Sequence, residues 1–229
     1  YGRSGPSGGN WSRYGAVESL DATTESFTLR KDRSFTFAID TLDNDETVQQ
    51  LEAASALARQ QREVVIPEVD TYVYGEIAAG AGTKVEIPSM DNSTIYMEIL
   101  EGANVLDNNQ VPEENRQLIV PPDTLLLMKQ CKDIVMETDI GNDLRIKGVI
   151  SNLDGMNVIK VPASRLPKNC AFIIAHPCAT VAPTKLASYN THINPPGING
   201  QLVEGRIVYD AFVLENKKMA IYYAAHKAS

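Results

Sequence analysis

Strand-like alternation marks the first patterned stretch of the chain. Apolar side chains stand at every second position in two short groups: Phe27, Leu29, Phe35, Phe37 and Ile39. A period of two is typical of β-strands. The polar run 31–33 between the groups predicts a turn, so a two-stranded hairpin is expected over 27–40. Because an isolated hairpin is marginally stable in water, this one is expected to pack on a further surface, such as a neighbouring subunit.

Helical periodicity follows the hairpin. Asp43 and Glu46 form a capping-box-like pair before a helix that is predicted to reach about Arg62. Pro67 is expected to separate it from a second helix over 68–79.

A third helix is predicted over 93–107, with an apolar stripe from Ile95 to Leu106. Ser89, Asp91 or Asn92 is expected to cap it. This helix is predicted to be the longest in the protein.

The remainder of the chain has the pattern of short strands separated by Gly, Pro and Asn-rich turns. The predicted strands are 117–120, 145–151, 156–161, 171–176, 205–214 and 219–224, and one further helix is expected to begin near Asp123. Residues 1–15 are rich in Gly and Ser and cannot bury enough apolar surface to order alone, so they are interpreted as an extended arm. The order of arm, hairpin, helices and mixed strands indicates an α+β protein.

Composition and charge argue against several classes of protein. The 229-residue chain carries a formal net charge of −8 and an isoelectric point near 4.9, which argues against a surface that grips nucleic acid over its whole area. Three cysteines without framework spacing favour a reducing compartment over a disulfide-built domain. No run of about 18 apolar residues is present, so membrane insertion is not expected.

The glycine-rich stretch 75–84 superficially resembles a phosphate-binding loop. Ala81 stands where that loop requires its lysine, and the stretch follows a predicted helix instead of a strand. Gly80 and Gly82 are therefore interpreted as a helix stop that needs a positive φ angle.

Other candidate chemistry is equally incomplete. Cys170, His176 and Cys178 are possible zinc ligands, but tight paired spacing is absent, and a core cysteine beside a strand-end histidine is favoured. The histidines at 176, 192 and 226 belong to no recognisable catalytic motif. The acids at 43, 45 and 46 are explained more simply by helix capping than by acid–base chemistry or a divalent cation. No catalytic residue, cofactor or metal is therefore expected.

Four collinear segments together resemble the major capsid proteins of tailed phages. They are 32–47, with Ser34-Phe35-Thr36-Phe37; 65–72, with Val65-Ile66-Pro67; 154–167, with Asp154-Gly155-Met156; and 199–217, with Tyr209-Asp210-Ala211-Phe212. The resemblance implies a Hong Kong 97-like capsid fold. Its parts would be an arm (1–15), an extended loop hairpin (16–42), a peripheral domain (43–116) with a spine helix at 93–107, an axial domain (117–200), and C-terminal strands (201–229) that return to the core.

The resemblance also implies a function without catalysis. A capsid subunit would self-assemble into pentamers and hexamers of an icosahedral shell in the host cytoplasm and enclose double-stranded DNA without reading its sequence. Portal, scaffold and decoration proteins are further candidate partners. The expected subunit contacts are Phe27, Leu29, Lys31, Arg33, Phe35 and Phe37 of the hairpin, and Trp11, Arg13 and Tyr14 of the arm. Two alternatives stay open, an encapsulin-like nanocompartment shell and a cytoplasmic metal-dependent or hydrolytic enzyme that would use Cys170, His176 and Cys178.

Overall fold

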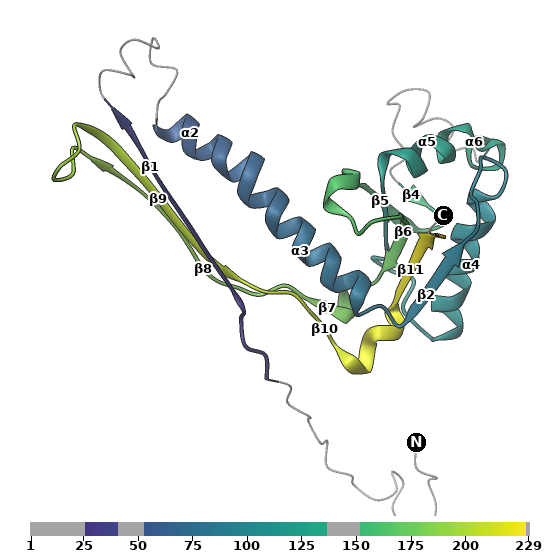
Figure 1. Ribbon diagram of the computed structural model, residues 1–229. Helices are drawn as coiled ribbons and strands as arrows, with labels where there is room; N and C mark the ends of the chain where they lie inside the picture. The colour runs from purple at the N-terminus through teal and green to yellow at the C-terminus, as the bar shows by residue number, and fades with distance from the viewer. Residues whose placement is uncertain (1–25, 41–52, 137–151, 228–229) are drawn as a thin grey trace, which may run out of the picture.

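An elongated limb joins a rounded lobe in the computed structural model, which describes residues 26–40, 53–136 and 152–227 (Figure 1). The limb comprises a three-stranded sheet and the helical run 53–79 that lies along it. The lobe comprises a six-stranded sheet and the helices packed on it. This mixture of helices and sheets confirms the α+β prediction.

The limb sheet consists of β1 (Lys31–Asp40), β9 (Gly200–Tyr209) and β8 (Thr184–Ile193), in that order across the sheet. β1 pairs antiparallel with β9 from Lys31 opposite Tyr209 to Asp40 opposite Gly200. The predicted turn at 31–33 is therefore wrong, because these residues lie inside a strand. Their side chains have distant partners: Asp32 bonds to Arg206, and Arg33 to Glu68. The observed hairpin is β8–β9, and β1 is a third strand added to it.

One continuous helical run crosses the predicted break at Pro67. It comprises α2 (Ala53–Gln60), a π-helical segment (Gln61–Val65) and α3 (Ile66–Ala79). Proline lacks a backbone N–H, and its ring crowds the carbonyl four residues earlier, which normally interrupts an α-helix. Here the carbonyl four residues before Pro67 belongs to the wider π segment 61–65, which accommodates the proline ring, so the helix continues. This run, and not the predicted helix at 93–107, is the longest among the described residues.

The lobe sheet has the strand order β2-β11-β6-β3-β5-β4. The bounds are β2 (Thr83–Ile87), β3 (Gln117–Val120), β4 (Asn152–Leu153), β5 (Met156–Lys160), β6 (Cys170–Ala175) and β11 (Ile221–His226). Every residue of β6 is buried, because both faces of the sheet are covered. α4 (Ile95–Asn108), α5 (Pro122–Gln130) and α6 (Lys132–Met136) contribute to the core on one face, which contains Phe172 and Ile174. The end of α3 packs on the opposite face, around Ile173.

Short strands β7 (Thr180–Val181) and β10 (Phe212–Val213) pair where the limb meets the lobe (Figure 1). The strand predicted at 205–214 is therefore two strands, the end of β9 and β10, separated at Asp210 and Ala211. The predicted strands at 117–120, 156–161, 171–176 and 219–224 are confirmed as β3, β5, β6 and β11 to within a few residues. β2 and β8 were not predicted. The predicted strand at 145–151 and the first part of the helix that follows Asp43 lie outside the described residues.

Asp91, one of the three candidate caps, instead orders the turn that leads into the third predicted helix, whose N-cap residue is Thr94 and has no side-chain cap hydrogen bond. Its carboxylate Oδ1 accepts hydrogen bonds from the backbone N–H groups of Ser93 at 2.8 Å and Thr94 at 3.0 Å. The hydroxyl of Ser93, followed by these backbone bonds, lowers the pKa of Asp91. α4 begins just after this turn, at Ile95.

Gly80 and Gly82 end α3 for a different reason from the predicted one. The φ angle of Gly80 is −86°, and neither glycine has a positive φ angle. A Cβ atom on Gly80 would lie 2.6 Å from Cγ2 of Val213, and one on Gly82 would lie 2.6 Å from the backbone oxygen of Lys218. Close approach of the C-terminal segment, and not backbone conformation, requires glycine at these positions.

Two further observations concern the predicted domain boundary at residue 200 and the length of the helices. Residue 200, where the predicted axial domain ends, is the first residue of β9, so that boundary divides the β8–β9 hairpin. Among the described residues, no helix combines the length and apolarity needed to cross a bilayer.

Candidate assembly surface

The limb sheet has an apolar side that faces the helical run. Phe35 and Phe37 of β1 pack against a small cluster formed by Ile39, Ala53 and Val203. The ring of Phe35 also lies 6.2 Å from the ring of Tyr189 on β8, measured between centroids. β9 lies between these two strands.

Gly205 on β9 allows the two aromatic rings to lie across the middle of the sheet. A Cβ atom there would lie 2.5 Å from Cζ of Phe35 and 2.8 Å from Cδ1 of Tyr189. A larger residue at 205 would push both rings off the central strand.

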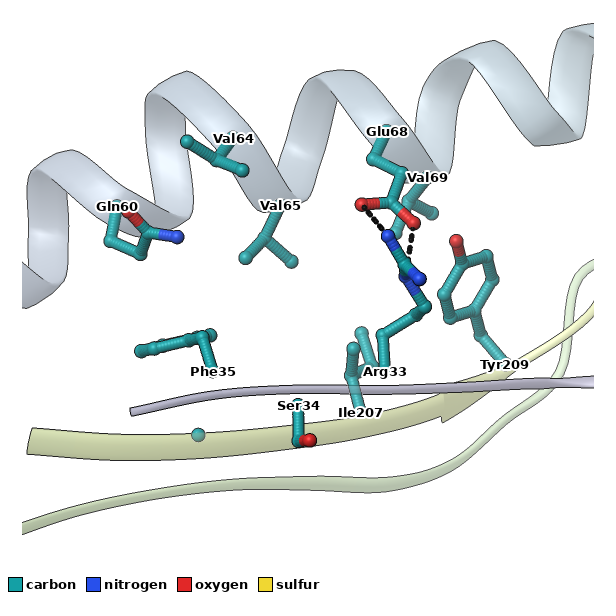
Figure 2. A pocket seen from close by; sticks show the side chains of 11 residues that line it. Arg33, Ser34, Phe35, Gln60, Val64, Val65, Glu68, Val69, Ile207 and Tyr209 are labelled. Atoms are coloured by element: carbon teal, nitrogen blue, oxygen red, sulfur yellow. Dashed lines mark hydrogen bonds and ion pairs between the residues drawn. The ribbon is translucent and has the colours of Figure 1, made fainter. Parts of the chain in front are cut away.

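A cavity of about 150 Å³ separates the helical run from the sheet (Figure 2). Its lining is mostly apolar, from Phe35, Val64, Val65, Val69, Ile207 and Tyr209. Arg33 on the sheet and Glu68 on α3 bridge the gap, with 2.6 Å between Nε and Oε1. The hydrogen bond to Glu68 raises the pKa of Arg33. The helix is therefore held over the sheet at one point by an ion pair beside incompletely filled apolar space.

The opposite side of the sheet is polar. Arg206 donates hydrogen bonds from Nε and Nη2 to the carboxylate of Asp32 at 2.9 and 2.5 Å. Nε2 of His192 lies 3.0 Å from Oε1 of Glu204. The hydrogen bonds from Arg206 and His192 lower the pKa values of Asp32 and Glu204, respectively. Because these pairs are exposed, they contribute little to stability, and this side of the limb is suited to water.

Asp210 occupies the junction between limb and lobe, one residue after β9. Its side chain is fully buried. The carboxylate accepts hydrogen bonds from the backbone N–H of Arg30 at 2.9 Å, Nε of Arg30 at 3.1 Å, the hydroxyl of Tyr72 at 2.7 Å, and the N–H of Ala211 at 2.8 Å. Burial alone would raise the pKa of Asp210, but these hydrogen bonds outweigh it and hold that pKa well below its usual range. Burial, and then the bond to Asp210, raise the pKa of Tyr72 to about 12.

The sequence analysis did not select Asp210 as a site residue. One signal was available, since a single acid interrupts the apolar run 207–213. Buried acids require partners, but the partner, Arg30, is 180 positions away in the chain.

The tip of the β8–β9 hairpin exposes an apolar side chain. Ile193, the last residue of β8, is 76% exposed, the largest fraction for any large apolar side chain in the described ranges. The turn after it contains Pro195 and Pro196.

The predicted contact residues at 27–37 all lie within the described residues. Phe27 stacks on Phe212, with ring centroids 4.4 Å apart, and Nζ of Lys31 lies 4.6 Å from the centroid of the Tyr72 ring. Arg33, Phe35 and Phe37 contact the helical run and sheet described above, and Leu29 is half-buried. The further surface expected for this segment is therefore supplied in part by its own chain, and its contacts with a neighbouring subunit stay a prediction. Trp11, Arg13 and Tyr14 lie outside the described residues.

The candidate zinc ligands do not converge on one point. Nδ1 of His176 accepts a hydrogen bond from the N–H of Cys178 at 3.1 Å, and Nε2 lies 3.0 Å from the backbone oxygen of Glu114. Burial raises the pKa of Cys170 to about 12, so its thiol stays protonated at neutral pH. Within the described ranges, no three His, Cys, Asp or Glu side chains are grouped so as to hold a metal ion. The acids at 43, 45 and 46 lie outside those ranges.

Comparison with known proteins yields structural matches only. No family model and no curated protein matches the chain. A structure from Mycobacterium phage Che8 is similar at 15% identity, with a TM-score of 0.70 over 88% of this chain and 76% of that one. The capsid structure of cyanophage P-SCSP1u is similar at 14% identity, with a TM-score of 0.70 over 93% of this chain and 81% of that one. A virus-like particle from Pyrococcus furiosus is similar at 16% identity, with a lower TM-score of 0.54 over 85% of this chain and 75% of that one. At such identities a match establishes the fold, and the chain therefore has the fold of tailed-phage capsid proteins.

Proposed function

We propose that the chain is a major capsid subunit, which assembles into the pentamers and hexamers of an icosahedral shell around double-stranded DNA. The observation that carries the proposal is the match to the cyanophage capsid structure over 93% of this chain and 81% of that one. A match of that extent includes both limb and lobe. We assign the limb to the peripheral domain and the lobe to the axial domain, which moves α4, expected from the sequence as the spine helix of the peripheral domain, into the axial domain, and moves β8 into the peripheral domain. The proposed role is structural instead of catalytic.

The charge of the chain fits a container for DNA. At a net charge of −8, the subunit as a whole repels the phosphate backbone, so packed DNA is not trapped by its container. We place the subunit in the virion, after assembly in the host cytoplasm, with portal, scaffold and decoration proteins as further partners.

Subunit contacts in the proposed shell come from two regions. The first consists of the segment and arm residues expected from the sequence: Phe27, Leu29, Lys31, Arg33, Phe35, Phe37, Trp11, Arg13 and Tyr14. Of these, Phe27 keeps 44% of its surface exposed after it stacks on Phe212. The second is the limb tip, where the exposed Ile193 would gain by burial against a neighbour.

An encapsulin-like shell is the second candidate function. The similarity to the Pyrococcus furiosus virus-like particle favours it, although the TM-score of 0.54 is below the 0.70 of the cyanophage capsid. The contents of purified particles distinguish the two functions, since a capsid encloses DNA and a nanocompartment encloses a cargo protein. The enzyme alternative gains no support from the separate positions of Cys170, His176 and Cys178.

Electron microscopy of the purified full-length protein tests the proposal. Shells, tubes or rings of capsomers are expected, and a stable monomer at high concentration would contradict a capsid role. Ile193→Asp is expected to block or reduce assembly while leaving the subunit folded. Leu126→Asp on α5 is the matched control, because Leu126 is also an exposed apolar side chain, at 56%. Normal assembly of Ile193→Asp would remove the limb tip from the proposed contacts.

A further inference from the structure

The hydrogen bonds of Asp210 connect three segments that are distant in sequence. Asp210 follows β9, Tyr72 belongs to α3, and Arg30 precedes β1. Each carboxylate oxygen is used: Oδ2 accepts from the backbone and Nε of Arg30, and Oδ1 accepts from Tyr72 and Ala211. A buried carboxylate that loses such donors is left with an uncompensated charge, so these segments are strongly favoured in one relative position.

Contacts around Asp210 reinforce the same arrangement. Phe27 stacks on Phe212 at 4.4 Å, and the guanidinium carbon of Arg30 lies 5.9 Å from the centroid of that ring. Nη2 of Arg30 also lies 3.7 Å from Oε2 of Glu76 on α3. The segment 27–30 is therefore fixed to β10 and to α3 simultaneously.

The cluster can affect the shape of the subunit through α3, because it joins β1 and β9 of the limb sheet to this helix and the end of the helix packs on the lobe. The chain passes between limb and lobe through α3, between β7 and β8, and between β9 and β10 (Figure 1). The N–H of Asp210 bonds to the oxygen of Pro183 at 3.2 Å, which ties the second of these passages to the third. A cavity of about 40 Å³ lies beside them, lined by Val73, Ile77 and Phe212 among others. A small unfilled apolar space at a junction leaves room for its strands to move.

We propose that Arg30, Tyr72 and Asp210 form a latch that holds β1 and β9 against α3, whose end packs on the lobe, and so keeps the limb sheet at one angle to the lobe. We propose further that opening this latch widens the range of curvatures in assembled shells. This second proposal rests on the proposed capsid function. Arg30 is suited to a releasable latch, because its side chain is 57% exposed and can be hydrated when it leaves the buried carboxylate of Asp210.

Substitutions at the latch test, on unassembled subunits, whether the latch fixes the angle between limb and lobe. Asp210→Asn keeps the size of the side chain and removes its charge, and Tyr72→Phe removes only the hydroxyl. The control is Asp32→Asn, which makes the same change of charge in the exposed pair with Arg206. In Asp210→Asn the amide proton of Arg30 is expected to exchange about tenfold faster, the factor for losing roughly one hydrogen bond to a charged group. It should be unchanged in Asp32→Asn.

A distance between the limb and the lobe reports the angle between them. Spin labels at Pro196→Cys on the limb tip and Met97→Cys on α4, in a Cys178→Ser background, are expected to give one narrow distance distribution. Asp210→Asn and Tyr72→Phe should broaden it, and Asp32→Asn should not. An unchanged distribution in both latch variants would overturn the latch. Tyr72→Phe keeps the ring under Lys31, so it provides the decisive variant if Asp210→Asn does not fold.

The size of assembled shells tests whether opening the latch widens the range of curvatures. Wild type and Asp32→Asn are expected to give the same distribution of particle diameters by cryo-electron microscopy, and latch variants a broader one or tubes. Equal distributions for latch variants and wild type would overturn the link to curvature. If wild-type protein forms no particles, the proposed function fails, whereas the exchange and distance measurements still decide the latch.

Discussion

Gly82 offers a sharp test of the packing between the end of α3 and the C-terminal segment. A Cβ atom there would lie 2.6 Å from the oxygen, 2.7 Å from the carbon of Lys218 and 2.8 Å from the nitrogen of Met219. All three are backbone atoms, which yield less easily than the end of a side chain. The N–H of Gly82 also donates to the oxygen of Lys218 at 2.9 Å. Gly82→Ala therefore forces the two backbones apart and weakens the bond between them.

The expected loss follows from these contacts. Overpacking costs about 1–3 kcal/mol, the weakened hydrogen bond about 0.5–1.5 kcal/mol, and the reduced entropy of the unfolded chain returns about 0.4–1 kcal/mol. Gly82→Ala should therefore lower the free energy of unfolding by about 0.5–4 kcal/mol. A loss of about 2.5 kcal/mol corresponds to a fall in Tm of about 5–10 °C for a chain of this size.

Gly75→Ala is the matched control. Gly75 lies within α3, and a Cβ atom there would meet nothing within 4 Å. The same substitution should raise stability by about 0.5–1 kcal/mol, because alanine is the better helix former. Urea unfolding followed by far-ultraviolet circular dichroism, at one subunit concentration below assembly, compares the variants. A Gly82→Ala protein as stable as wild type would refute the close-packing explanation of this glycine.

Three further results are expected. The pKa of Asp210 is lowered from its ordinary value of 3.8, so its stabilising contribution should be complete above that pH and decline as the pH falls toward the folded-state pKa. The difference in stability between wild type and Asp210→Asn, measured from pH 7 downward, should therefore be constant and then shrink in acid; a constant difference throughout would contradict this. Cys178 is exposed, whereas Cys131 and Cys170 are buried. A thiol reagent should therefore modify one thiol per native subunit rapidly and the other two only on unfolding. Thr124→Val should destabilise the lobe by about 1–2 kcal/mol in urea unfolding, because the buried Thr124 hydroxyl donates to the oxygen of Ala171 at 2.7 Å. Rapid modification of all thiols would contradict the expected thiol reactivity. A Thr124→Val unfolding midpoint equal to that of wild type would contradict the expected loss of stability.

Elements with a strong local pattern could be predicted from the sequence. The apolar run that forms β6 is buried on both faces, and such strands are apolar throughout. The stripe of α4 likewise matches the residues that it buries, including Ile95, Ile99 and Leu106. In these cases local sequence and tertiary environment agree.

Elements that depend on distant partners could not be predicted. β8 is mostly polar and exists as a strand because it pairs with β9 along nearly its whole length. The charges at 31–33 are typical of a turn until Arg206 and Glu68 are placed beside them. The hydrogen bonds of Asp210 at the junction could not be predicted for the same reason, since nothing in the local sequence identifies Arg30 as its partner.

The position of β11 has a consequence for synthesis. This strand, last in the described part of the chain, lies in the interior of the lobe sheet, parallel to β2 on one side and antiparallel to β6 on the other. Without it, β2 has no strand to join, and one long edge of β6 is open. A ribosome must therefore have translated residue 226, and released it from the exit tunnel, before the lobe can close. Nascent chains in which residue 226 is still inside the exit tunnel would then lack a finished lobe, which would keep these incomplete copies out of the proposed shell.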